Sequence, residues 1–344
     1  MNFRTYRTLL TLGAIALLTP ANARAVDTQE RSSLRASSAA EALSSMSVET
    51  RLAEPGVPGG TEAAFTTIVS TLNASGQPRI AIGPNGMQNW DDLGVLALSP
   101  SGDWSLRVHD DGSFQFFANV FDETALTKDL QYPEPSDLDI ESVGLSFIQN
   151  ALSPLVPLAP NEEVVLLGID SLQRWVDDGK RQGEEIAVLA FFGRKIDNVH
   201  VVGPGSKISL LLSRSLDIIG VDVDWPVYRK SSSVGTVSIE KVFDRAEKIR
   251  SIAAADLQAG TSIVECGLYD PGYGLRGNVP LQPGCLLFVD TRVDPAGPED
   301  ELMAIPLGED VDIDCNWPET TALAFVPWEP CGLLGSILDF WEPN

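Results

Sequence analysis

The sequence predicts an α+β protein in which antiparallel sheets each pack on one helix, in two related units. A helical pattern at 136–152 precedes a series of apolar strand-like runs, and a second helical pattern at 238–257 precedes another series. Turn residues separate the runs closely, which favours antiparallel connections between neighbouring strands. The order of one helix followed by a meander of strands therefore occurs twice along the chain.

The first helix is predicted from its start, its periodicity and its end. Ser136 followed by Asp139 resembles a capping box, which satisfies backbone N–H groups of the first turn. Pro154 cannot continue a helix, so the helix is expected to end before it. The apolar residues that recur at helical spacing are Ile140, Val143, Phe147, Ile148, Ala151 and Leu152.

Short apolar runs broken by turn chemistry predict the strands. The stretch WSLRVHDDGSFQFF at 104–117 alternates on both arms and has Asp-Gly at its tip, so it predicts a hairpin. After the first helix, consecutive antiparallel strands are predicted at 164–169, 172–176, 186–192, 207–212 and 217–225.

The second unit repeats this order. Asp244 and Lys248 form a favourable pair one turn apart on the helix at 238–257. The motif VDVDWP at 221–226 recurs in part at 311–318, where two residues separate VDID from WP, and this favours an internal duplication. Strands are predicted after the second helix at 261–269, 284–293, 301–307 and 311–315.

Five segments are predicted along the chain. Residues 1–25 combine two early arginines, an apolar run and Ala21-Asn22-Ala23, which is typical of a secretory signal. Residues 26–60 are poor in large apolar side chains and are expected to form a flexible leader. The remaining segments are an N-terminal antiparallel β segment at 61–130, a first α+β unit at 131–230 and a second, disulfide-stapled unit at 231–344.

The charge balance is strongly acidic, with 48 acidic against 24 basic residues and a net charge of −24. Such a charge keeps a protein soluble and repels nucleic acid and anionic lipid. After the signal, no stretch approaches the roughly 20 apolar residues that a membrane helix needs. We therefore expect an exported protein, periplasmic or released, that neither binds nucleic acid nor inserts into a membrane.

The four cysteines, Cys266, Cys285, Cys315 and Cys331, all lie in the last quarter of the chain. In an exported protein an even number predicts disulfides, and four cysteines allow three pairings. We prefer Cys266–Cys285 and Cys315–Cys331, because each bond closes a short loop. A zinc site is the alternative, but no C-x-x-C pair is present and the histidines lie far away in sequence.

The stretch LAFFGRKIDNVHVVGPGSKISLLL at 189–212 carries a family resemblance. An aromatic strand leads into Asn198-Val199-His200-Val201-Val202-Gly203, followed by a glycine turn and another apolar strand. This pattern resembles PepSY and FTP-type domains of exported proteins, with Asn198 where glycine is usual; Asn tolerates a left-handed backbone. The resemblance covers 137–226, with 238–318 as a degenerate copy. It implies cystatin-like units and a binding or inhibitory module without catalytic residues.

The sequence offers little for hydrolytic or phosphate chemistry. It has two histidines, His109 and His200, and lacks both a G-x-S-x-G elbow and an H-E-x-x-H pair, so we interpret His200 as an ordinary strand residue. The turn at 203–207 lacks phosphate-loop spacing, so Gly203 and Gly205 are interpreted as turn glycines. No catalytic residue, cofactor site or metal site is predicted.

Two features of the C-terminal region leave alternatives open. The first positions of a calcium loop are echoed at Asp310, Asp312 and Asp314. The residues between these acids are apolar, which favours a strand with one solvated face. Four large aromatic side chains form either part of the core or an interaction surface, namely Trp317, Trp328, Phe340 and Trp341.

Together these observations predict an exported, non-enzymatic module that binds a protein or peptide, with a peptidase-inhibitory or propeptide-like role as its narrower form. Two alternatives remain. A hydrolase with an unconventional carboxylate site is favoured if two acids converge and one is shielded from water. A structural envelope protein with weak calcium binding is the other. The oligomeric state is left open.

Overall fold

The computed structural model describes residues 48–53, 60–80, 82, 87–91, 94–118, 129–175, 183–234, 241–250, 261–272, 281–289, 301–308 and 322–324. Within these ranges strands predominate, numbered β1 to β15, against the helices α3, α5 and α6 and one short 3-10 helix, η1. The chain divides into two units. The first comprises Ala53–Arg229 and Gly272–Gly277, and the second comprises Met1–Leu52, Lys230–Pro271 and Asn278–Asn344.

In the first unit, a helix twice precedes a meander of strands. The first run consists of α3 (Gly60–Ala74), β2 (Met87–Asp91), β3 (Gly94–Leu98), β4 (Trp104–His109) and β5 (Phe114–Ala118). After η1 (Asp129–Gln131), the second run consists of α5 (Asp137–Asn150), β6 (Glu162–Trp175), β7 (Gly183–Ile196), β8 (Val199–Val202), β9 (Lys207–Ser213) and β10 (Ile218–Asp224).

Both runs share one antiparallel sheet. Its strand order is β2-β3-β4-β5-β10-β9-β7, with β6 on the outer side of β7 and β8 paired with the end of β7. The last strands of the two runs, β5 and β10, are neighbours, and Gln115 lies directly opposite Asp222. The first strands of the two runs are each paired on one side only among the described residues: β2 pairs with β3, and β6 pairs with β7.

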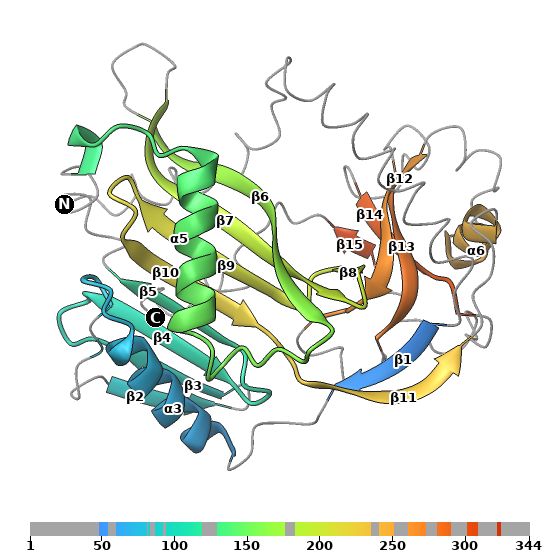
Figure 1. The fold of residues 1–344 in the computed structure, drawn as a ribbon, viewed down its shortest axis with the longest axis horizontal. Coiled ribbons are helices and arrows are strands. Elements are labelled where there is room, and N and C mark those ends of the chain that lie inside the picture. Colours follow the sequence, from blue (N-terminus) through green and yellow to red (C-terminus); the bar gives the residue numbers. More distant parts are fainter. Residues whose placement is uncertain are drawn as a thin grey trace, which may run out of the picture. The chain divides into compact units, whose positions relative to one another are not determined.

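Helices α3 and α5 lie on the same face of this sheet, which we call the helix face (Figure 1). Ile68 and Leu72 of α3 and Phe147 of α5 join one hydrophobic core with the strand side chains that face them. Gly144 lets α5 approach the sheet closely, because an added Cβ would lie 2.3 Å from the Phe192 ring. The opposite side, which we call the second face, carries a smaller apolar cluster of Ala187, Leu211 and Ile219 with the flanking Phe117, Ile186 and Leu189.

The second unit has its own antiparallel strands, which pair in chain order. They are β12 (Thr261–Tyr269), β13 (Gln282–Val289), β14 (Glu301–Pro306) and β15 (Ala322–Ala324). Helix α6 (Lys241–Arg250) contacts β14, and Arg245 donates hydrogen bonds to the carbonyls of Pro306 and Gly308 at 2.6 and 2.9 Å. A separate two-stranded sheet pairs β1 (Val48–Ala53) with β11 (Tyr228–Val234).

The predicted fold class is wrong. We expected α+β architecture, with antiparallel sheets each packed on one helix in duplicated cystatin-like units, but the described chain is mostly strand. The order of helix and meander does recur, at α3–β5 and at α5–β10, yet the two meanders share one sheet and one core. The reason is the pairing of β5 with β10, which joins strands that are apolar on the same face. The segment expected to hold only strands at 61–130 also contains most of α3.

Several local expectations are confirmed. Ser136 is the N-cap of α5, and its hydroxyl accepts a hydrogen bond from the Asp139 N–H at 3.2 Å. The predicted hairpin is formed by β4 and β5, with Trp104 opposite Ala118. The prediction of two separate strands at 164–169 and 172–176 is wrong: they form a single strand, β6, because pairing with β7 continues through Asp170 and Ser171.

The preferred disulfide Cys266–Cys285 is also confirmed, and it joins directly opposite residues of β12 and β13. A disulfide is compatible with export. Cys315 and Cys331 lie outside the described residues, as do the expected signal at 1–25 and most of the expected leader at 26–60. None of the helices in the described part of the chain is long and apolar enough to cross a membrane.

Candidate functional site

The open edge of β6 is the candidate site. β6 pairs with β7 along its whole length, from Glu162 opposite Ile196 to Trp175 opposite Gly183 (Figure 1). On its other side, no strand among the described residues pairs with it. Alternate N–H and C=O groups of an edge strand point away from the sheet, so a 14-residue edge is a template for another strand.

Exposed apolar side chains accompany this edge on the second face. Leu167 and Leu172 are 39% and 38% exposed. Leu172 lies opposite Ala187, and Asp170 lies opposite Leu189, so these side chains share the second face with the cluster there. We define the edge surface as the unpaired side of β6 together with Leu167, Gly168, Asp170 and Leu172. It combines a strand edge with apolar side chains that gain from being covered.

A bulge shapes the edge surface. The register between β6 and β7 shifts at Leu166/Gly168, so Leu167 is the extra residue. Its side chain lies over β7, where an added Cβ on Gly193 would come within 2.6 Å of it. Gly168 faces open space, because a Cβ added there would have no atom within 4 Å. The result is an empty position on the second face beside an exposed leucine.

One acid lies between the two leucines of the edge surface. Asp170 is half-buried, and its Oδ1 accepts a hydrogen bond from the Ser171 N–H at 2.7 Å. Its neighbours two positions along the same face are Gly168 and Leu172. A carboxylate in this apolar setting favours a cation over an anion, and the net charge of −24 adds to that preference.

His200 lies in a strand, as the sequence predicted. It belongs to β8 and pairs with Lys195 of β7. The two-residue turn before it is made by Asp197 and Asn198, with φ of 53° and 65°, so Asn198 adopts the left-handed backbone expected of it. Gly203 has φ of 98°, which supports its interpretation as a turn glycine. His109 lies at the end of β4, opposite Gly94.

A buried arginine fixes the strand that leads into this hairpin. Arg194 Nη2 lies 2.6 Å from Glu162 Oε2, and its Nη1 donates to the Pro226 carbonyl at 2.6 Å. The guanidinium also lies over the rings of Trp225 and Tyr228, 4.7 and 5.1 Å from their centroids. Sequence reasoning did not identify this cluster. Because the Arg194 and Glu162 side chains are almost completely buried, the cluster stabilises the fold and does not form a binding site.

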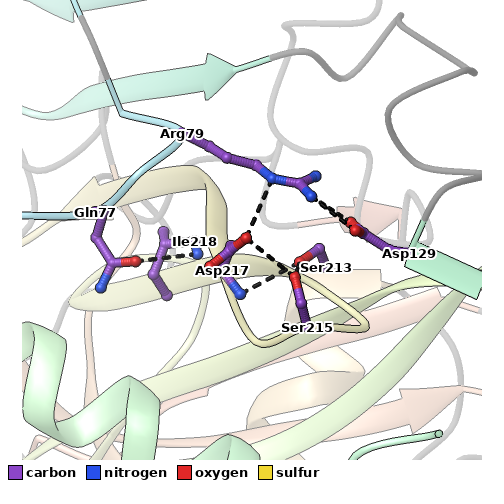
Figure 2. Close-up of polar contacts among 7 residues, drawn as sticks. All are labelled: Gln77, Arg79, Asp129, Ser213, Ser215, Asp217 and Ile218. Carbon is purple, nitrogen blue, oxygen red and sulfur yellow. Dashed lines mark hydrogen bonds and ion pairs between the residues drawn. The ribbon is translucent and has the colours of Figure 1, made fainter. Parts of the chain in front are cut away.

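A second polar cluster surrounds Arg79 (Figure 2). Arg79 Nη2 lies 2.6 Å from Asp129 Oδ2, and its Nε lies 3.3 Å from Asp217 Oδ2. Asp217 also accepts a hydrogen bond from the Ser215 hydroxyl at 3.0 Å. The cluster ties the loop after α3 to η1 and to the turn between β9 and β10. Because the arginine lies between the two carboxylates, they do not form the converging acid pair that the hydrolase alternative requires.

A polar row crosses four adjacent strands on the second face. Arg107 lies opposite Gln115, Gln115 opposite Asp222, and Asp222 opposite Ser209. Burial raises the pKa of Asp222 to about 7, while a hydrogen bond from Gln115 Nε2 at 3.4 Å lowers it. Asp222 is therefore an acid of raised pKa, on a side chain that is half-buried. Its direct partners in the row are an amide and a hydroxyl, so a second converging carboxylate is missing from the row.

The remaining predicted features are not described. Asp310, Asp312 and Asp314 lie outside the described residues, and so do Trp317, Trp328, Phe340 and Trp341. In the ranges that the structure does describe, no group of three or more His, Cys, Asp or Glu side chains is placed to hold a metal ion. A scan against protein-family models and a search of curated proteins find no match for the chain.

Proposed function

We propose that the protein is an exported binding module that captures a segment of another protein by adding it as a strand to β6. The open edge of this 14-residue strand, with Leu167 and Leu172 exposed beside it, carries the proposal. Strand addition draws affinity from main-chain hydrogen bonds and selectivity from side chains at alternate positions. Both kinds of group lie together on the edge surface.

The same features also guard the edge against unselective pairing. Bulges and charged side chains on edge strands hinder edge-to-edge aggregation, and β6 has a bulge at Leu167 and a carboxylate at Asp170. This edge carries a bulge and a carboxylate but still exposes two leucines. It therefore favours a partner strand whose side chains fit around the bulge at Leu167. A purely protective edge would gain nothing from those leucines.

Selection of peptides tests the proposal. A displayed library of random ten-residue peptides is selected on the full exported chain, and the enriched peptides are measured by fluorescence anisotropy. We expect Leu172→Lys to weaken them roughly tenfold, since it places a solvated cation in an apolar contact. Leu138→Lys is the matched control, because Leu138 is a 77% exposed leucine on α5, which covers the helix face and not the second face.

Hydrogen exchange supplies a second readout. Binding should slow exchange at β6 amides and leave the amides of the far edge strand, β2, unchanged. The proposal fails if no peptide is enriched, or if the enriched peptides bind Leu172→Lys and Leu138→Lys equally well. A peptidase as the natural partner is a narrower proposal that rests on the family resemblance; inhibition of envelope peptidases by the exported chain tests it.

A further inference from the structure

We infer that the segment captured by β6 carries an apolar residue, a basic residue and another apolar residue at alternate positions. This inference rests on the proposed function and names the chemistry of the partner. A strand repeats its side-chain direction every two residues, so the residues that a partner places on the second face are spaced by two. The three β6 positions that they meet are Leu172, Asp170 and Gly168.

The two outer positions select apolar side chains. At one of them, Leu172 is 38% exposed and offers an apolar contact. At the other, Gly168 has no side chain and faces open space, and the exposed Leu167 borders that space. A large apolar side chain on the partner fills the space over Gly168 and covers Leu167, whereas a small or polar one leaves the leucine in water.

The central position selects a cation. Among the four side-chain positions named for the edge surface, Asp170 is the acid, and it is placed between the two apolar positions. Opposite charges directly across two strands attract each other, and like charges repel. The order apolar, basic, apolar reads the same in both directions, so the pattern holds for a parallel or an antiparallel partner strand.

Four synthetic peptides test the pattern on the full exported chain by fluorescence anisotropy. The matching probe is Thr-Val-Thr-Lys-Thr-Leu-Thr. The second probe has Glu in place of Lys, and the third moves both apolar residues next to the Lys, as in Thr-Thr-Val-Lys-Leu-Thr-Thr, so that they face the other side. The fourth replaces both apolar residues with Thr. We expect the matching probe to bind most tightly, and more weakly as salt is added.

Charge exchange identifies the contact with Asp170. Asp170→Lys should weaken the Lys probe and strengthen the Glu probe, each by about fivefold, as expected of a cross-strand ion pair. Glu163→Lys is the matched control, because Glu163 is exposed on the same strand and face but lies beyond the bulge. Circular dichroism checks that both variants fold.

The outcomes separate the inference from the proposed function. If peptides selected from the library lose affinity with Leu172→Lys but the four probes bind equally, the pattern is wrong and strand addition to β6 stands. If Asp170→Lys leaves the preference for Lys over Glu unchanged, the central contact is wrong. Failure of both the library and the probes overturns the two proposals together.

Discussion

Asp222 illustrates how the sheet alters the chemistry of a single side chain. The carboxyl group is placed between Gln115 and Ser209 on neighbouring strands, within the row that begins at Arg107. Its own strand also carries Asp224, which lies directly opposite Lys207 of β9. Burial keeps the group protonated to about pH 7, well above its ordinary pKa of 3.8. The folded protein therefore holds a proton that the unfolded chain releases.

The substitution Asp222→Asn is expected to remove one component of the pH dependence of stability. Between about pH 4 and pH 7 the folded state keeps the Asp222 proton and the unfolded state does not, so rising pH favours unfolding. The stabilisation is complete below pH 3.8 and is lost as the pH rises through 7. Its slope is up to about 1.4 kcal/mol per pH unit.

Urea unfolding of the wild type and Asp222→Asn across about pH 4 to 8 measures this effect. The difference in free energy of unfolding between them should change steadily up to pH 7 and level off above it, with the amide variant gaining as the pH rises. Asp137→Asn is the control, because Asp137 is exposed at the start of α5. Parallel curves for the wild type and Asp222→Asn would contradict the prediction.

At the level of elements, the packing of α5 on the sheet depends on Gly144. Alanine in place of a helical glycine usually stabilises a helix by about 1 kcal/mol. Here the new Cβ would lie 2.3 Å from the Phe192 ring, and Phe192 is completely buried, so the ring has little room to move. We expect Gly144→Ala to lower the free energy of unfolding by about 1–3 kcal/mol, as overpacked cores do.

Denaturant unfolding measures this loss. The dependence of the free energy of unfolding on denaturant concentration should be the same for the wild type and Gly144→Ala. The matched control is Ser146→Ala, on the exposed side of the same helix, which should change the free energy of unfolding by less than about 0.5 kcal/mol. If Gly144→Ala is as stable as the wild type, α5 does not press on the sheet as closely as the geometry indicates.

The elements that could be predicted from the sequence are those set by local chemistry. The Ser136 cap of α5 and the Asp-Gly turn between β4 and β5 are examples, since each depends on residues close together in the chain. Helix α3 was missed although Ala64, Ile68 and Leu72 recur every four residues and are buried. Its β-branched threonines have low helix propensity, and the packing of the apolar face overrides it.

The candidate site could not be predicted, because the edge of a sheet is a long-range property. Asp170 and Ser171 separate the two strands that the sequence predicts at 164–169 and 172–176. In the structure both residues pair regularly with β7 within the single strand β6, and β6 has a free side because β9 occupies the opposite side of β7. Only the pairing of strands far apart in sequence determines which strand has a free side.

At the scale of the whole molecule, a disulfide cross-links two strands of the second unit, β12 and β13. The Cys266–Cys285 disulfide has a sequence separation of 19, and closing a loop of that size contributes about 3 kcal/mol in the chain-entropy model. Replacing both cysteines with serine should therefore lower the stability of this unit by about that amount. The comparison is made with Cys315→Ser and Cys331→Ser already present, so that no other thiol can exchange.

Limited proteolysis followed by mass spectrometry measures the disulfide's effect. Cleavage within 261–289 should become faster in the serine variant, and cleavage within β2 to β10 should not. Equal acceleration in both regions would show instead that the two units unfold as one.

The meeting of β5 and β10 has a consequence for how the molecule assembles. Gln115 and Asp222 are 107 residues apart, so each helix and its meander can form locally before β5 and β10 pair. β5 and β10 can pair in the same register whether they belong to one chain or to two chains. At high concentration, two copies could exchange halves and yield an intertwined dimer in which every strand keeps its native neighbour.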